Sequence, residues 1–66
     1  MQIKVTYKHK EYLLRRYSKC TIKDAFKHYG IDTTSKKVSL CRRGNVLYYP
    51  ANETTELNDG DACLAE

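Results

Sequence analysis

Residues 21–30, TIKDAFKHYG, decide the fold of this chain, because no other segment carries apolar residues at helical spacing. Positions i, i+3, i+4 and i+7 of the segment are apolar, and the positions between them are polar or charged. The apolar side chains are those of Ile22, Ala25, Phe26 and Tyr29, and the opposite face carries Lys23, Asp24, Lys27 and His28. The pattern predicts one short amphipathic helix.

Both ends of this helix carry the residues that usually begin and end one. Thr21 can cap the first turn, and Asp24 three residues later completes a capping-box pattern near the positive helix end. Gly30 can take the left-handed conformation that ends a helix. A helix of about nine residues is marginal alone in water. Because the rest of the chain is predicted to be strand and turn, its apolar stripe must pack on a sheet.

The segment before the helix predicts a β-hairpin. Residues 2–7 alternate strictly between apolar and polar, which indicates a half-buried strand. Residues 8–10 form a short polar connection, and residues 11–17 return as a second strand. Either Tyr12 with Leu14 or Leu13 with Tyr17 could point inward, and a bulge would reconcile the two orientations. We favour Tyr12 and Leu14 inside.

Three further strands are predicted after the helix. Residues 37–42 alternate again, residues 42–45 have the composition of a turn, and residues 46–49 form a returning strand that Pro50 closes. Residues 51–58 are irregular, with Leu57 as their one large apolar anchor.

The end of the chain carries its strongest turn signal, Asn58-Asp59-Gly60-Asp61, followed by a last strand over residues 62–66. The element order is strand, strand, helix, strand, strand, strand. An opening hairpin followed by a helix lets the last strand return beside the first. We therefore expect one α+β domain spanning residues 1–66, a β-grasp fold with a mixed four- or five-stranded sheet packed on one helix.

Length and charge favour a binding role over an enzymatic one. Sixty-six residues carry 12 basic and 8 acidic side chains, a formal charge of +4, and no basic residue follows Glu53. A chain this short has little apolar surface left for a deep pocket. No apolar run approaches the length of a membrane span. We expect a small basic cytoplasmic protein that does not contact membranes.

Three cysteines lie about twenty residues apart, at Cys20, Cys41 and Cys63, without a C-x-x-C pair. The odd number argues against a closed disulfide framework and favours a reducing compartment, although a single bridge stays open. Cys63 is expected to point inward. Cys20 lies at the predicted helix start, where a thiolate is favoured, so it is the one thiol with a physical argument for reactivity.

The sequence predicts no catalytic, cofactor-binding or metal-ligating residues. His9 and His28 have no ligand or triad partner at a recognisable spacing. A glycine-rich phosphate loop, a pair of catalytic carboxylates and a nucleophile motif are all missing from the sequence. We therefore expect a protein that is not an enzyme.

Several segments resemble known small proteins. Met1-Gln2-Ile3 with Val5, followed by Cys20-Thr21-Ile22-Lys23 at the helix start, resembles the front half of ubiquitin. Val38-Ser39-Leu40, the Gly-Asn turn and Leu57-Asn58-Asp59-Gly60-Asp61 resemble the ThiS/MoaD sulfur carriers and the related TGS domains. The resemblance implies a β-grasp fold and docking onto a larger partner, such as an adenylating or sulfur-transfer enzyme.

In the carriers and modifiers, a thin Gly-Gly terminus is adenylated and then holds sulfur or is joined to lysines. This sequence ends Cys63-Leu64-Ala65-Glu66, with no glycine after Gly60. Three readings stay open. The native chain continues into a Gly-Gly tail and is a true sulfur carrier, the protein keeps the docking fold without carrier chemistry, or the likeness is one of fold alone.

The candidate partner-binding residues lie on the sheet face turned away from the helix and on the adjoining turn. Lys4, Thr6, Ser39 and Cys41 are also expected to face outward. Apolar and aromatic residues interleaved with arginine are typical of protein interfaces. The partner-binding candidates are Leu13, Arg15, Arg42, Arg43, Tyr48 and Tyr49.

A nucleic-acid-binding module is the alternative from a different class. Arginine and tyrosine side chains together can form a stacking and phosphate-binding platform for a single strand. The residues available for it are Arg15, Arg16, Arg42 and Arg43 with Tyr7, Tyr12, Tyr17, Tyr48 and Tyr49. No recognised nucleic-acid-binding motif accompanies them.

Overall fold

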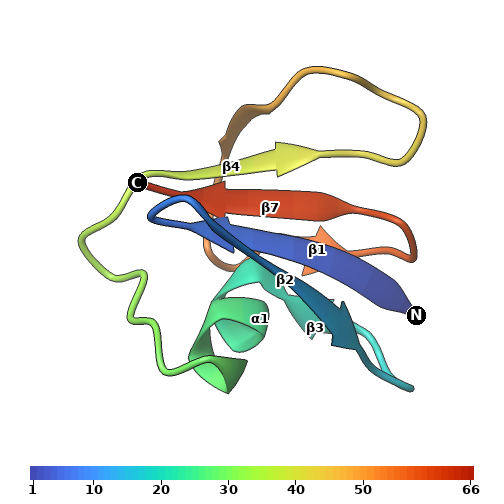
Figure 1. Cartoon of the computed structure of the whole chain (residues 1–66), viewed down its shortest axis with the longest axis horizontal. Helices are drawn as coiled ribbons and strands as arrows, with labels where there is room; N and C mark the ends of the chain where they lie inside the picture. Colours follow the sequence, from blue (N-terminus) through green and yellow to red (C-terminus); the bar gives the residue numbers. More distant parts are fainter.

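The chain forms one helix and seven strands, and the computed structural model describes all 66 residues. In chain order the elements are β1 (Gln2–Tyr7), β2 (Lys10–Arg15), β3 (Cys20–Thr21), α1 (Ile22–His28), β4 (Val38–Cys41), β5 (Tyr49–Ala51), β6 (Glu56–Leu57) and β7 (Ala62–Ala65). Along the chain the helix comes after the opening hairpin and before the later strands, as predicted, and in space it lies on one side of the sheet (Figure 1). No helix is long and apolar enough to cross a bilayer.

Five of the strands form one mixed sheet in the order β2-β1-β7-β4-β5. The last strand, β7, pairs in parallel with β1, and every other neighbouring pair in the sheet is antiparallel. β3 and β6 form a separate two-stranded ladder. The prediction of an α+β chain whose last strand returns beside the first is therefore confirmed.

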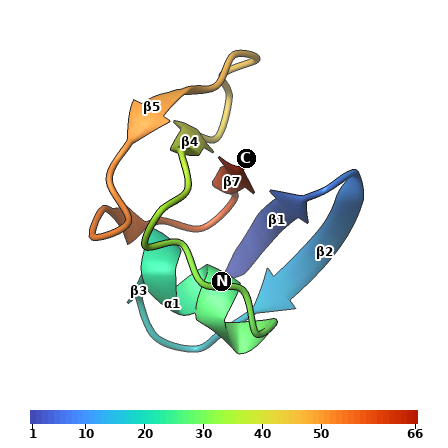
Figure 2. The same cartoon turned by 90° about the vertical axis from the view of Figure 1, so that its left-hand side faces the viewer.

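The core lies between α1 and one face of the large sheet (Figure 2). Twelve apolar residues are buried in a single cluster, and Phe26 is its largest fully buried side chain. Ile22 and Ala25 lie beside it on the helix, and Tyr29 is half-buried at the helix end. The amphipathic stripe predicted from the sequence is thus the face of α1 that packs on the sheet. The sheet contributes Ile3, Val5, Leu14, Val38, Leu40, Cys63 and Ala65.

The helix caps form as the sequence predicts. The Asp24 N–H donates to Thr21 Oγ1 at 3.3 Å, and the Thr21 N–H donates to Asp24 Oδ2 at 3.2 Å. The bond from the Thr21 backbone lowers the pKa of the Asp24 carboxyl below its usual value. The helix ends at His28, and Gly30 has a φ of +75°. The helix is shorter than the predicted segment 21–30, because Thr21 and Tyr29 are its cap residues and Gly30 follows the cap.

The opening hairpin has the predicted orientation. Leu14 is buried and Tyr12 packs against the core, whereas Leu13 is 56% exposed. The strand spans Lys10–Arg15 rather than residues 11–17, and Tyr17 is fully exposed beyond it. The register of β1 with β2 runs without a bulge.

The strand predicted over residues 46–49 is wrong in position. β5 begins at Tyr49 and contains Pro50, while Val46 and Leu47 are 90% and 76% exposed in the preceding loop. Pro50 is tolerated because β5 is the last strand of the sheet and needs no donor on its outer side. The ladder of β3 with β6 was not predicted, because strands of two residues leave no periodic signal.

The turn between β1 and β2 holds two residues in an unusual conformation. Tyr7 pairs with Lys10, so the loop has two residues, and both take positive φ angles, 48° for Lys8 and 65° for His9. Two positive φ values are what a type I′ hairpin turn requires, and Asn-Gly is the sequence that suits it best. Side chains with a Cβ are strained there.

Replacing the turn with Lys8→Asn and His9→Gly should therefore raise the free energy of unfolding by about 1 kcal/mol. Urea denaturation followed by circular dichroism measures the change. His9→Ala is the control, because it removes the imidazole and keeps the Cβ, and it should give no gain. Equal stabilisation by both variants would contradict the role given to backbone strain.

Candidate docking surface

No helix and no other strand packs on the face of the large sheet opposite α1 (Figure 2), although its residues on β4 and β7 are half-buried. Side chains alternate between the two faces of a strand, so the register shows which residues share this one. We call it the outer face. It is formed by Gln2, Lys4, Thr6, Glu11, Leu13, Arg15, Ser39, Cys41, Ala62 and Leu64.

The outer face is arranged in rows that run across the strands. One row crosses β2, β1, β7 and β4 and contains Leu13, Lys4, Ala62 and Cys41. The next row contains Glu11, Thr6, Leu64 and Ser39. Directly opposed residues on neighbouring strands lie about 5 Å apart. Apolar side chains from strands far apart in the sequence therefore form one surface with charged residues among them.

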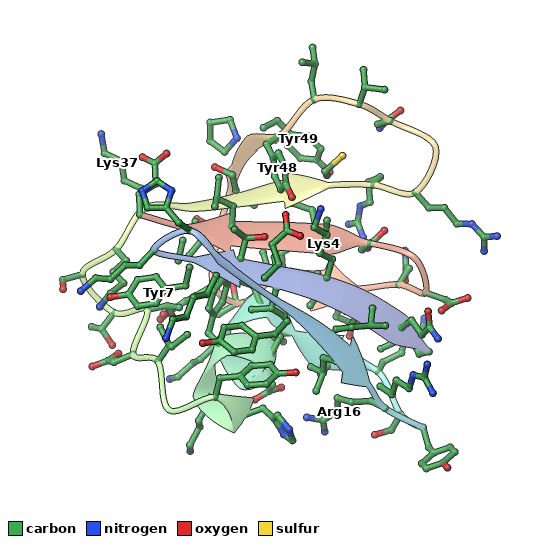
Figure 3. All side chains as sticks on the ribbon, in the orientation of Figure 1. Lys4, Tyr7, Arg16, Lys37, Tyr48 and Tyr49 are labelled. Atoms are coloured by element: carbon green, nitrogen blue, oxygen red, sulfur yellow. The ribbon has the colours of Figure 1, made fainter.

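Lys4 lies at the middle of this face and pairs with Glu11, with 3.1 Å between Nζ and Oε1. The hydrogen bond to Glu11 raises the pKa of Lys4 above its usual value, with smaller contributions from Tyr48 and Cys41. Figure 3 shows the ring of Tyr48 lying over β4 on the side of Lys4. Tyr48 therefore belongs to the same surface as Leu13, although the two residues are 35 positions apart.

The loop between β4 and β5 extends the surface with exposed apolar side chains. Val46 and Leu47 point into solvent, and Tyr48 is 40% exposed. The start of this loop is held in place by two bonds to residue 45: the Asn45 N–H donates to the Arg42 carbonyl at 3.0 Å, and the Cys41 thiol donates to the Asn45 carbonyl at 3.3 Å. An anchored loop with an apolar tip is suited to binding another molecule.

Arg42 is part of the internal structure rather than a free binding residue. Its guanidinium lies 2.6 Å from the carboxylate of Asp61, which is only 2% exposed. It also donates to the Glu56 carbonyl at 3.2 Å. The Asp61 carboxylate raises the pKa of Arg42 above its usual value. The remaining acceptor capacity of Asp61 is used by the N–H groups of Asn58, at 2.8 Å, and Arg43, at 3.3 Å.

The other candidate residues are placed less uniformly. Arg15 is exposed at the end of β2 on the outer face and makes no ion pair, and Arg43 is exposed 3.7 Å from Asp59. Tyr49 lies opposite Leu40 in the register, so it belongs to the other face at the sheet edge. The structure therefore brings Leu13, Arg15 and Tyr48 onto one face, and it does not place Tyr49 there.

Sequence reasoning missed the contribution of Val46, Leu47 and Leu64 to this surface. The first two were assigned to a strand, although four consecutive apolar residues between Asn45 and Pro50 show no alternation. That absence of period two was the signal that could have identified a loop. Leu64 follows Cys63, and the expected inward direction of Cys63 was the signal that could have placed Leu64 on the outer face.

The arginines and tyrosines considered for nucleic-acid binding are spread over separate parts of the molecule. Tyr12 stacks on Tyr29 of the helix end, with ring centroids 4.3 Å apart. Tyr7 lies near two lysines at the opposite end of the sheet from Arg16 (Figure 3). Tyr17 is fully exposed beyond β2. These side chains therefore do not form one stacking platform in this structure.

All three cysteines are free thiols, and the one expected to be reactive is buried. Burial raises the pKa of Cys20 above its usual value, and it raises the pKa of Cys63 to about 12. Burial of Cys20 therefore removes the physical argument for its reactivity. Cys63 points inward as predicted, and Cys41 is half-buried on the outer face.

No group of three or more His, Cys, Asp and Glu side chains is close enough to hold a metal ion. The surface has shallow hollows of about 300 Å³ that are open to solvent. One lies beside the helix end and is lined by Lys23, Lys27, Gly30, Ile31, Asp32 and Thr33. The candidate site is therefore the outer face, to which four strands contribute.

No protein-family model, curated protein or solved structure matches this chain.

Cys41 should be alkylated faster than Cys20 and Cys63 in the folded protein, because the two buried thiols have raised pKa values. Iodoacetamide labelling at neutral pH, followed by peptide mass spectrometry, gives the order. The same reaction in urea is the control, where the three rates should converge. Faster labelling of Cys20 in the folded state would contradict its burial.

Asp61→Asn should lower the free energy of unfolding by about 2 kcal/mol, because the buried carboxylate accepts charge-assisted hydrogen bonds. Asp59→Asn is the matched control, since it changes an exposed carboxylate of the same turn, and it should cost less. Urea denaturation measures both variants. Equal losses would show that burial of Asp61 adds nothing.

Proposed function

We propose that this chain is a β-grasp docking module, a relative of ubiquitin and of the ThiS/MoaD sulfur carriers, that binds a larger protein through its outer face. The strand order β2-β1-β7-β4-β5, with the parallel pair of β1 and β7 next to the antiparallel hairpin, supports this fold. The single helix across one face supports it as well.

One observation carries the proposal: the outer face and the adjoining loop expose the apolar side chains of Leu13, Leu47 and Tyr48. Exposed aliphatic and aromatic residues that gather on one surface mark interaction sites. Leu13 is held by the sheet, and a tyrosine such as Tyr48 supplies a large contact area at a low cost in conformational entropy. The outer face extends over four strands, which suits a protein better than a small molecule.

Charge around this surface indicates what the partner offers in return. Arg15 has no ion-pair partner in the molecule, and Arg43 has only a distant exposed one. Both can pair bidentately with carboxylates. We expect a partner that presents an apolar centre with acidic side chains around it. The resemblance to sulfur carriers directs the first search to an adenylating or sulfur-transfer enzyme.

Tyr48→Ala should weaken binding to such an enzyme from the same organism by at least about tenfold, because aromatic side chains dominate interface energies. Isothermal titration calorimetry measures the affinity. Tyr17→Ala is the matched control, since it removes another exposed tyrosine that lies beyond β2 and off the outer face. Its affinity should equal that of the unchanged chain.

Two results would count against the proposal. Equal losses from Tyr48→Ala and Tyr17→Ala would show that the outer face is not the contact. Tight binding of single-stranded RNA at low salt that falls steeply with added salt, without binding to the enzyme, would favour the nucleic-acid-binding alternative.

A further inference from the structure

We propose that two copies of this chain associate through the free edge of β2, antiparallel and with Leu13 on the two-fold axis, to form one continuous ten-stranded sheet. This inference does not depend on the proposed partner, because it rests on the backbone of the edge strand and on the charges beside it. β2 is one of the two edge strands of the large sheet and pairs only with β1 (Figure 2).

The hydrogen-bond pattern shows which β2 groups are unpaired. The Met1 and Arg16 backbones exchange two hydrogen bonds, each of 2.9 Å. Antiparallel ladders alternate between bonded and non-bonded pairs. With the observed register, Leu14 and Tyr12 are therefore bonded to β1, whereas Arg15 and the other odd-numbered residues of β2 are not. The N–H and C=O groups of Glu11, Leu13 and Arg15 point away from the sheet.

The opposite edge of the sheet does not offer a comparable surface. β5 has only three residues, and the central one is Pro50, which has no N–H. β2 has six residues and no proline. An unpaired strand of this length is a template for pairing with another chain. β2 is thus the edge at which the sheet can grow.

One register uses every outward group of β2. With Leu13 opposite Leu13 of the second copy, Glu11 lies opposite Arg15 at both ends, and six backbone hydrogen bonds can form. A shift of two residues in either direction leaves Glu11 or Arg15 opposite a residue outside the strand. The side chains agree with the same register, because each Glu11 carboxylate faces an Arg15 guanidinium.

Both charged groups are available for this contact. Glu11 is exposed and pairs only with Lys4, and a carboxylate can accept from two donors at once. Arg15 is exposed and has no ion-pair partner of its own. On the outer face the two Leu13 side chains, each 56% exposed, would cover one another. A second copy of the chain therefore matches this edge in hydrogen bonding, charge and apolar contact.

Sedimentation equilibrium of the purified chain should show a monomer–dimer equilibrium. Arg15→Glu should weaken dimerisation by about tenfold or more, because two attractive contacts become repulsive. Glu11→Arg should do the same. An equimolar mixture of the two single variants should form a heterodimer, since every charged position in that pair is again opposed by the opposite charge. Urea denaturation of each variant separates loss of pairing from loss of folding.

Methylation of the Leu13 backbone nitrogen tests the hydrogen bonds without changing a side chain, and a chain of 66 residues can be made by chemical synthesis. Because this N–H points away from β1, the fold should persist and the dimer should be lost. The same methylation at Tyr17, beyond the end of β2, is the control and should leave the dimer intact.

A chain that stays monomeric at about 1 mM would overturn the proposal. A dimer that tolerates both the charge reversals and methylation at Leu13 would overturn it too, since it would have to form elsewhere. Neither result would bear on binding to an enzyme through Tyr48. This residue lies over β4, which is separated from β2 by the strands β1 and β7.

Discussion

The arrangement of the central strands depends on the hydrogen bonds of the Asp61 carboxylate. This carboxylate is buried, and it accepts hydrogen bonds from the Arg42 guanidinium and from the backbones of Asn58 and Arg43. The Asp61 carbonyl also accepts from the Lys4 N–H at 3.0 Å. One residue therefore joins the turn before β7 to β1 on one side and to the end of β4 on the other. These bonds tie β7 to both of its neighbours in the sheet, β1 and β4.

The turn that contains Asp61 also aligns the parallel pair of strands. The Gly60 N–H donates to the Gln2 carbonyl at 2.8 Å, and Asp59 accepts from the Gln2 N–H at 2.7 Å. A parallel strand has no hairpin to set its register. These contacts provide that constraint, so that alternate residues of β7 face the core and Leu64 faces outward. The composition of the outer face is thus decided at a turn far from it in the sequence.

The same sheet offers two different kinds of contact. The outer face carries side chains of four strands and adjoins an exposed apolar loop, and it is suited to a partner that covers a broad area. The β2 edge exposes backbone groups, and it is suited to another strand. Leu13 belongs to both, because its side chain lies on the face and its N–H points from the edge. Association of two copies would therefore place two docking faces side by side.

The sequence by itself determined the elements whose signals are local. Helical spacing and the Thr21–Asp24 capping pair located α1, and strict alternation located β1, because these features involve neighbours along the chain. Glycine and asparagine marked the turns before β5 and β7. The orientation of β2 was also predicted correctly from the preference for Tyr12 and Leu14 inside. Such features need no knowledge of what packs against them.

Only the tertiary structure decided the position of β5, the burial of Cys20 and the membership of the candidate site. Val46 and Leu47 could either pair with β4 or project into solvent. Which of the two occurs depends on the length of β4 and on the edge position of Pro50. A helix start lowers the pKa of a thiol only where solvent reaches the thiol. Cys20 is buried where β3 pairs with β6, and this burial raises its pKa. The sequence suggested Arg42 as a partner-binding residue, whereas in the structure its guanidinium pairs with the buried carboxylate of Asp61. These outcomes rest on contacts between distant segments, for which spacing along the chain carries no information.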